Sequence, residues 1–489
     1  MRAFVRLWAI ACLFNLISHF DLQGGVLVLA GRAACLAIAG YVAVRPCGRG
    51  WSVLAATYLA LSIADAPRVN NHGVLIAVVH VVGLIGALRV GGWRAGGWGA
   101  DAERTWWRRM RPFLRGSLAI LYFWAVVHKL NGGFLDPVWS CASSEWAKLT
   151  ASRPFEIPLN WLPEGVGIQR LAIAATLVVE TAIPLSLLFR GTRRFGIGLA
   201  VVFHGWLGMT YPAFSATLWA LLAAFLPDVA AQRATRTEHD AANTIDRPLV
   251  FGAAAFATVL AVAAAALQTP EDSAVAWSLP LLRHLFLVYT VVLGVRIVAA
   301  WKDMDLSPGP GRGPAPEGAV AWLALACIGA LPYLGVQATR SFAMYSNLEV
   351  SSGRSNHLVV PAAWQRVFDR RSPLVTIRGS SDPILAALAR PGWSGAPDNR
   401  SFSTFGRPPV DAARRSPPRW RLPLRALRSR VAERAARGER TMLSYEIDGR
   451  AYHTLDAAED PLLTSPRAWE RRFVRPRAVP DGAEGLCMW

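Results

Sequence analysis

Long apolar runs limit the fold of this chain more than any other feature of its sequence. A helix needs about twenty predominantly apolar residues to cross the roughly 30 Å hydrocarbon core of a membrane. Such runs recur through the first two-thirds of the chain, where charged residues are scarce. We place about eleven of them at 2–20, 26–44, 51–66, 73–90, 116–135, 167–189, 195–211, 213–230, 249–268, 277–299 and 318–337. The expected fold of residues 1–337 is therefore an all-α polytopic membrane bundle of about ten or eleven transmembrane helices.

The basic residues indicate how this bundle is oriented, because Lys and Arg near helix ends remain on the cytoplasmic side. They concentrate in every second loop, near residues 2–6, 45–49, 94–115, 190–194, 233–247 and 302–312. The intervening loops hold only Arg68, Lys148 and Arg153. We therefore expect the amino terminus in the cytoplasm and the chain after residue 337 outside it. The first run carries Asn15 and His19 where a signal peptide would end, so we interpret it as a retained helix.

A formal net charge of +19 raises the question of nucleic-acid binding. Membrane topology accounts for the basic short loops, and most of the remaining charge lies in the carboxy-terminal segment. We therefore expect the lipid bilayer, and no nucleic acid, as a partner. The stretch WRRMRPFLR, with Trp93, Trp98 and Trp106 nearby, predicts an interfacial helix on the inner leaflet, where indoles lie at headgroup depth and arginines meet anionic lipid.

After residue 337 the apolar runs shorten to strand length, and Pro, Arg and Ser become frequent. We expect residues 338–489 to form a soluble, mainly β domain outside the membrane. Asp448-Gly449 between two alternating segments is typical of a type I′ hairpin turn, and NHLVVP and PLVTIRG are further strand candidates. One face of a predicted amphipathic helix holds Leu424, Leu427, Val431 and Ala435. Packing of that face on the sheet is the favoured interpretation, and docking on the membrane is the alternative.

Six cysteines in a chain of 489 residues do not make a disulfide scaffold. Cys12, Cys35 and Cys327 lie in predicted spans and Cys47 lies in a predicted cytoplasmic loop, which leaves Cys141 and Cys487 on the oxidising side. A bond between these two would tie the carboxy-terminal domain to the long outer loop at 132–165. The sequence does not give their distance, so their pairing stays open. No spacing typical of metal ligands occurs, and we expect no metal site.

Ionisable side chains inside apolar runs are costly in a membrane and are often functional. His128 and Lys129 lie near the outer end of the span at 116–135, and Glu180 lies in the middle of the next span. Pro184 removes the amide that would bond the Glu180 carbonyl, which predicts a kink beside the carboxylate. Snorkelling to the headgroups also explains a lysine this close to a helix end, so Lys129 alone does not decide the matter.

Further polar residues are expected in the same part of the membrane. Asn71 and His72 open the span at 73–90 from the outside, His204 lies inside the span at 195–211, and Tyr122 precedes Lys129 on its helix. Each has an ordinary explanation, since an Asn ahead of a helix is most often its cap. Taken together, these residues predict a polar pocket that opens to the outside.

Three segments occur in a suggestive order: NNHGVLIAVVH, LYFWAVVHKLNGGFLDPVW and LVVETAIPLSLLFRGTRRFGIGLAVVFHGWLGMTYPAFSATLWALL. In order and spacing they resemble the vitamin K-dependent gamma-carboxylase and its bacterial relatives, the HTTM (horizontally transferred transmembrane) proteins. The resemblance covers residues 50–230, with a weaker echo in FAMYSNLEVSSGRSNHLVVP. It implies that Lys129 is the base that deprotonates a reduced quinone, assisted by Asn71 and His72. The matching acid and Phe-His pair fall on Glu180 and His204, which we take as pocket residues together with His128 and Tyr122.

The resemblance also implies a reaction. In the family a reduced quinone, such as menaquinol or a vitamin K hydroquinone, reacts with O2 to give a strong base, which removes a proton from a glutamate γ-carbon before CO2 adds. A desolvated amine is more easily neutral, which suits Lys129 to general-base catalysis. The implied substrate is an exported peptide or protein, and the implied location is the inner (plasma) membrane of a bacterium. Two alternatives stay open: an HTTM-type factor that matures secreted peptides without carboxylase activity, and a transporter or receptor that binds a lipid or quinone.

Overall fold

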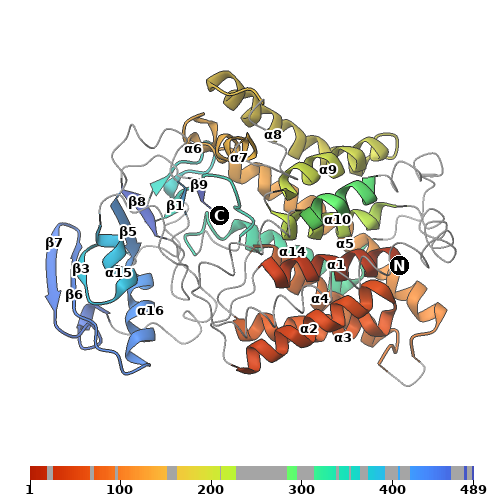
Figure 1. Cartoon of the computed structure of the whole chain (residues 1–489), viewed down its shortest axis with the longest axis horizontal. Helices are drawn as coiled ribbons and strands as arrows, with labels where there is room; N and C mark the ends of the chain where they lie inside the picture. Colours follow the sequence, from red (N-terminus) through yellow and green to blue (C-terminus); the bar gives the residue numbers. More distant parts are fainter. Residues whose placement is uncertain are drawn as a thin grey trace.

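Helices make up most of the chain, and a small antiparallel sheet lies near the carboxy terminus (Figure 1). The computed structural model describes residues 1–18, 26–65, 71–93, 97–150, 162–209, 211–226, 284–294, 313–336, 341–351, 354–363, 373–390, 406–407, 419–463, 478–481 and 487–488. The expected span at 249–268 lies outside these residues, and the span expected at 277–299 is described only over the helix His284–Gly294.

Up to the middle of the chain, helices occupy the positions of most of the long apolar runs. The helical part comprises α1 (Arg2–Ser18), α2 (Val26–Val44), α3 (Gly48–Asp65), α4 (Asn71–Arg89), α5 (Ala100–Lys129), α6 (Gly132–Leu135), α7 (Cys141–Thr150), α8 (Val166–Leu188), α9 (Arg193–Gly208), α10 (Pro212–Leu222) with the 3-10 turn η2 (Ala223–Phe225), and α14 (Pro316–Ala330). The short helices α6 and α7 fall in the segment that the sequence predicts to be an outer loop.

Within the described part of the chain, α4 and α8 combine the length and the apolar composition that crossing a membrane requires. Shorter apolar helices occur at Val28–Val44, Pro212–Phe225, His284–Gly294 and Pro316–Ala330. Length and composition alone do not separate a membrane span from the buried core helix of a soluble protein. The coarse fold class is therefore mainly helical with a carboxy-terminal antiparallel sheet.

Helix α5 differs from its prediction, because the expected interfacial helix is the first half of one continuous helix that runs through Pro112. The reason is packing. Trp106, Met110 and Phe113 are buried on one face of this first half, and the Trp106 indole donates a hydrogen bond to the Gly83 carbonyl over 2.9 Å. The apolar face of this half is thus packed against α4.

The two ends of the helical part are distinguished by their contacts. At one end Glu317, in the first turn of α14, forms ion pairs of 2.9 Å with Arg89 at the end of α4 and of 3.1 Å with Arg109 of α5. At the other end Asn71 Oδ1, at the start of α4, accepts a hydrogen bond of 2.8 Å from the Phe342 amide. The segment that follows α14 therefore packs on the end of the helical part where α4 begins.

The main sheet has five antiparallel strands in the order β7-β6-β3-β5-β8. They are β3 (Leu374–Ser380), β5 (Arg419–Pro423), β6 (Leu443–Ile447), β7 (Arg450–Thr454) and β8 (Val479–Asp481), and two small pairs are formed by β1 (Val350–Ser351) with β2 (Arg354–Ser355) and by β4 (Gly406–Arg407) with β9 (Cys487–Met488). The hairpin prediction is confirmed, because Asp448 and Gly449 join β6 to β7 with positive φ values of 49° and 80°.

Two helices cover this sheet, α15 (Pro383–Ala389) and α16 (Leu424–Ala435). Leu424, Leu427 and Val431 of α16 share one core with strand residues such as Val375 and Tyr445, so the apolar face packs on the sheet as favoured. The strand predicted in NHLVVP is wrong apart from one bridge between His357 and Asn131. There the His357 Nδ1 atom accepts hydrogen bonds from the amides of Val359 and Val360. These amides are therefore not available to pair with a neighbouring strand.

Candidate functional site

A cavity of about 350 Å³ lies between the helices of the first half of the chain, at the end where α4 begins. Its walls come from α4 to α10 and from residues 342–345. Most of its lining is apolar, including Leu75, Val179, Phe203, Trp206 and Phe214. Its polar lining includes Asn71, His72, Lys129, Glu145 and Glu180. An apolar pocket with a few placed polar groups is the usual form of a small-molecule site.

Lys129 and Glu180 form a buried ion pair in the cavity wall. The Lys129 Nζ atom lies 2.7 Å from Oε2 and 3.0 Å from Oε1 of Glu180, and the two side chains are 4% and 10% exposed. Lys129 is the last residue of α5, and Glu180 lies in the middle of α8, which continues through Pro184. The Lys129 Nζ atom also donates to the Ala125 carbonyl over 3.3 Å. Lys129 is thus held inside the protein by a partner on another helix rather than extended to headgroups.

Asn71 and His72 reach the same cavity from the first turn of α4. Because Asn71 Oδ1 accepts the Phe342 amide, the donor end of its side-chain amide is what it can offer to a ligand. Both side chains are buried, at 7% and 9% exposure. All three residues of the predicted catalytic set, Lys129, Asn71 and His72, therefore line one cavity, and Glu180 pairs with Lys129 there.

Tyr122 and His204 were predicted as pocket residues, but neither is part of the cavity lining. The Tyr122 hydroxyl and His204 Nε2 are hydrogen-bonded at 2.5 Å, which links α5 to α9. The His204 ring packs edge-on against the ring of Phe214, and Phe214 lines the cavity. These two residues support the wall from behind.

His128 was predicted as a pocket residue, and its placement there is wrong. Its ring stacks on Trp124, its Nδ1 atom is 2.8 Å from the Tyr333 hydroxyl and its Nε2 atom is 3.0 Å from the Ser341 carbonyl. These contacts tie the end of α5 to the segment after α14. Successive residues of a helix point about 100° apart, so the neighbour of Lys129 faces a different side.

Residues 341–347, where the weaker part of the resemblance begins, contribute a part of the wall that the sequence did not assign to the pocket. Phe342, Tyr345 and Asn347 have φ values of 63°, 52° and 54°, in the left-handed region that non-glycine residues rarely adopt. Such backbone conformations cost about 1–3 kcal/mol each and cluster at functional sites. Phe342 and Tyr345 line the cavity directly. These backbone conformations lie in the turn that forms this part of the cavity wall.

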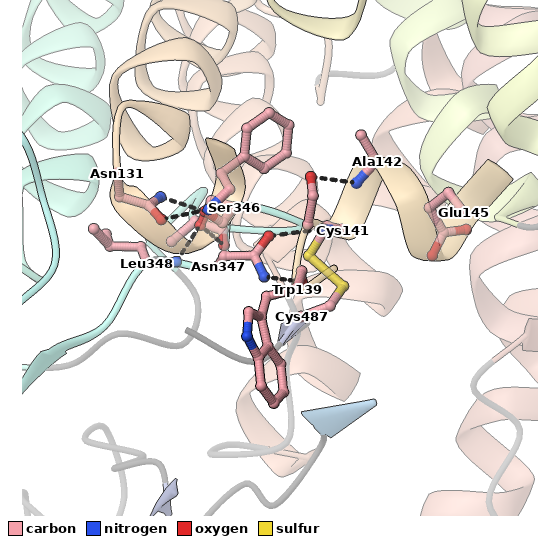
Figure 2. Close-up of a disulfide and its surroundings, with 12 residues drawn as sticks. Asn131, Trp139, Cys141, Ala142, Glu145, Ser346, Asn347, Leu348 and Cys487 are labelled. Atoms are coloured by element: carbon pink, nitrogen blue, oxygen red, sulfur yellow. Dashed lines mark hydrogen bonds between the residues drawn. A yellow bond between two sulfur atoms is a disulfide. The ribbon is translucent and has the colours of Figure 1, made fainter. Parts of the chain in front are cut away.

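The cavity wall at α7 is fastened by a polar network and a disulfide (Figure 2). The Asn347 side chain accepts a hydrogen bond of 2.7 Å from the Cys141 amide and donates one of 2.6 Å to the Trp139 carbonyl. Cys141, which lines the cavity, is joined by a disulfide to Cys487 of β9, with 4.7 Å between the two Cα atoms. The pairing that the sequence left open is thus present in the structure.

Glu145 is the functional candidate that sequence reasoning missed. It lies one helical turn after Cys141 on α7, and both side chains line the cavity. The Tyr211 hydroxyl donates a hydrogen bond of 2.8 Å to Glu145 Oε1. A carboxylate in a polar stretch that is predicted to be a loop is ordinary and does not indicate a site. The one available signal was the four-residue spacing of Cys141 and Glu145, which places both on one face if the stretch is a helix.

The described residues contain no group of three or more His, Cys, Asp or Glu side chains placed to hold a metal ion. Comparisons of the chain with known protein families, with curated proteins and with solved structures give no match. The cavity and its polar residues are therefore the features of the structure that indicate a function.

Proposed function

We propose that this chain is an integral membrane enzyme that binds a reduced quinone in the cavity and uses Lys129 as the base that accepts its hydroxyl proton. The observation that carries the proposal is the buried pair of Lys129 and Glu180 in the wall of a mainly apolar cavity whose lining also includes Asn71 and His72. We further propose that the chain belongs to the family of the gamma-carboxylase and HTTM proteins. Its substrate would be an exported peptide or protein, and O2 and CO2 would be its co-substrates.

The residues of the cavity fit an apolar aromatic ligand with a polar edge. Ligand pockets usually have volumes of about 300–1,000 Å³ and are lined by hydrophobic side chains with a few polar groups. Aromatic rings from Phe134, Trp206 and Phe214 supply flat apolar surfaces, and the polar groups are few. A reduced quinone supplies the acidic hydroxyl and the electrons of the reaction when it is bound.

Proton transfer in the site involves two protein groups. To accept a proton, Lys129 Nζ must first be neutral, and Glu180 Oε2 at 2.7 Å is positioned to take one proton from it. The neutral amine can then accept the ligand's hydroxyl proton, so the net result is one proton moved from the ligand to the Lys129–Glu180 pair. The side-chain amide of Asn71 and the ring of His72, in the lining of the same cavity, would orient the hydroxyl.

The proposed topology agrees with the position of the site. The cavity lies at the end of the helical part where residues 341–347 pack, and the same end carries the disulfide of Cys141 with Cys487. Disulfides persist in oxidising compartments outside the cytoplasm. This supports an outward-facing cavity and an extracytoplasmic carboxy-terminal domain at the inner membrane of a bacterium.

The test compares Lys129→Ala and Lys129→Arg in purified, detergent-solubilised protein. We expect both variants to bind the quinol with an affinity near that of the wild type and to lose turnover by about 10²- to 10⁴-fold, because a guanidinium does not release its proton at accessible pH. The measurements are quinol oxidation and incorporation of labelled CO2, with Lys302→Ala as control. An active Arg variant would show that Lys129 is not a base. Quinol oxidation without CO2 incorporation in the wild type would instead favour the HTTM-type factor.

A further inference from the structure

Two neighbouring apolar side chains are exposed in the segment between α14 and the main sheet. They are Leu358 and Val359, which we call the apolar pair, and they are 61% and 72% exposed. Single apolar side chains are common on protein surfaces. Two in succession on a backbone that is held in place are less ordinary, because their exposure to water is not relieved by a change of conformation. The pair therefore raises the question of what covers it.

The apolar pair is fastened to the end of helix α5. The Leu358 amide donates a hydrogen bond of 2.9 Å to the carbonyl of Leu130, the residue directly after α5. His357, which precedes the pair, is buried, and its Nε2 atom lies 2.8 Å from the Val127 carbonyl of α5. Two hydrogen bonds to one helix end thus fix the position of the pair relative to α5.

Each backbone amide from His357 to Val360 has an acceptor within the protein. The amides of Val359 and Val360 donate to His357 Nδ1 over 3.1 and 2.9 Å. The His357 amide donates to Ser355 Oγ over 3.2 Å, and the bond of the Leu358 amide to α5 completes the set. Lipid offers no hydrogen bonds in place of those of water, so an irregular segment meets lipid only where its polar groups are bonded internally. The donors of this segment fulfil that condition.

The length of α5 places the pair at the edge of the hydrocarbon layer. Arg109 of α5 forms an ion pair with Glu317 at the opposite end of the helical part. At 1.5 Å per residue, Leu130 lies about 31 Å further along α5 than Arg109. The hydrocarbon core of a membrane is about 30 Å thick. With the ion pair at the inner surface, Leu130 and the pair bonded to it therefore lie where the hydrocarbon of the outer leaflet meets the headgroups.

The outer surface of α5 continues toward the pair as an apolar face. Phe123 is exposed on α5, two helical turns before Leu130 and on the same side of the helix. A protein partner fits this place less well than lipid. A stable protein interface covers about 800 Å² on each partner, which two side chains do not supply. A peptide that adds a strand needs free backbone groups, and the amides here are already bonded.

We propose that Leu358 and Val359 insert into the outer leaflet of the bilayer and anchor the carboxy-terminal domain to the membrane surface. The partner is the boundary layer of lipid between acyl chains and headgroups. His357 is the positioning residue, because its ring bonds the amides of the inserted segment and joins them to α5. The inference rests on the membrane placement in the proposed function and is independent of the quinol site and of Lys129.

The test measures the depth of a nitroxide spin label by its collisions with O2 and with a neutral, polar nickel complex. The full chain is placed in lipid nanodiscs without thiol reductants, so that the disulfide remains closed. Cys47→Ala and Cys327→Ala remove the two free cysteines that are not buried. A single cysteine is then introduced and labelled at Leu358 or, in a separate variant, at Val359.

Two positions of similar exposure serve as matched controls. Val178 is exposed on α8, and Leu455 follows β7, on the side of the sheet away from the helices (Figure 1). We expect the ratio of O2 to nickel collisions at both residues of the pair to be close to that at Val178. It should exceed the ratio at Leu455 by about fivefold or more, because a polar complex is excluded from hydrocarbon.

The outcomes separate this inference from the placement on which it rests. A water-like ratio at Leu358 and Val359, with a lipid-like ratio at Val178, overturns the anchor and leaves the membrane placement standing. A water-like ratio at Val178 overturns the membrane placement, and the anchor with it. Few collisions with either reagent at the pair mean that protein, such as a second copy of the chain, covers it, which also overturns the anchor. If one of the two labelled variants fails to fold, the other decides.

Discussion

Lys129 and Glu180 are buried together, so each side chain depends on the other for its place in the protein. Removing one partner of a buried ion pair leaves an uncompensated charge and costs about 3–5 kcal/mol, whereas replacing both with apolar residues is often nearly neutral. We expect Glu180→Gln and Lys129→Met each to lower the free energy of unfolding by about 3 kcal/mol, and the double variant to recover most of the loss.

Unfolding of the detergent-solubilised protein, followed by tryptophan fluorescence, provides the measurement. All three variants should lack turnover, so that stability and activity separate in the double variant. Additive losses, with the double variant the least stable of the three, would mean that the two side chains are stabilised independently of each other.

Prediction from sequence was most successful for residues whose chemistry contrasts with their surroundings. Lys129 and Glu180 are identifiable because ionisable groups inside apolar runs are costly, and the structure places them in contact. His128 carries the same signal and faces elsewhere, because periodicity does not say which side of a helix meets a cavity. Glu145 could not be found, since a carboxylate in a polar segment is ordinary and only the tertiary fold turns it inward.

Helices α5 and α14 approach each other closely because Gly116 has no side chain. A Cβ atom at this position would overlap the indole of Trp322, whose Nε1 atom donates a hydrogen bond of 2.9 Å to the Phe113 carbonyl. We expect Gly116→Ala to destabilise the protein by about 1–3 kcal/mol, because the added methyl group must displace a packed ring. The thermal midpoint Tm in detergent is the measurement.

Gly167, in the first turn of α8, is the matched control, because nothing lies within 4 Å of a Cβ atom built there. Gly167→Ala should keep the stability of the wild type or raise it by up to about 1 kcal/mol, as expected from helix propensity alone. Equal effects of the two replacements would contradict the close contact between α5 and α14.

Among the elements, those specified by local patterns were predictable and those specified by distant contacts were not. Apolar runs gave the positions of α1 to α4, and the Asp448-Gly449 pair gave the hairpin of β6 and β7. The first half of α5 was assigned to the membrane surface because its tryptophans and arginines match an interfacial pattern. Its burial depends on contacts with α4, such as that of Trp106 with Gly83, which a local pattern does not contain.

For the molecule as a whole, the central prediction is its orientation in a membrane. We expect a cysteine placed at Leu455, which is 72% exposed on the sheet domain, to react with an impermeant maleimide in intact cells. A cysteine at Arg108, exposed on the first half of α5, should react only after lysis. Labelling of the wild type measures the background signal from its own free cysteines.

Labelling of both positions in intact cells, or of Arg108→Cys alone, would contradict the alternation of basic loops. Such a result would also move the cavity to the cytoplasmic side and so remove the exported substrate from the proposed function. Lysis of the same cells before labelling shows that both sites are reactive when reached.

At this scale the sequence indicated the order of helices and sheet, but not how the two parts meet. Loop charges and run lengths are local properties, and they predicted a carboxy-terminal domain beside the outer ends of the helices. The close packing of residues 341–347 around Asn71 and His128 arises from backbone conformations with positive φ and from long-range hydrogen bonds. Neither leaves a recognisable pattern in the amino-acid order.

The bond between Cys141 and Cys487 can form only after nearly the whole chain has been synthesised. The two cysteines are 346 residues apart in the chain. A ribosome that adds roughly 5–20 residues per second needs on the order of 20 to 70 s to make that stretch. During this interval Cys141 has emerged without its partner, and the wall that carries Glu145 cannot be covalently closed. A nascent chain that is released too early would therefore carry the proposed base without the tether that completes its cavity.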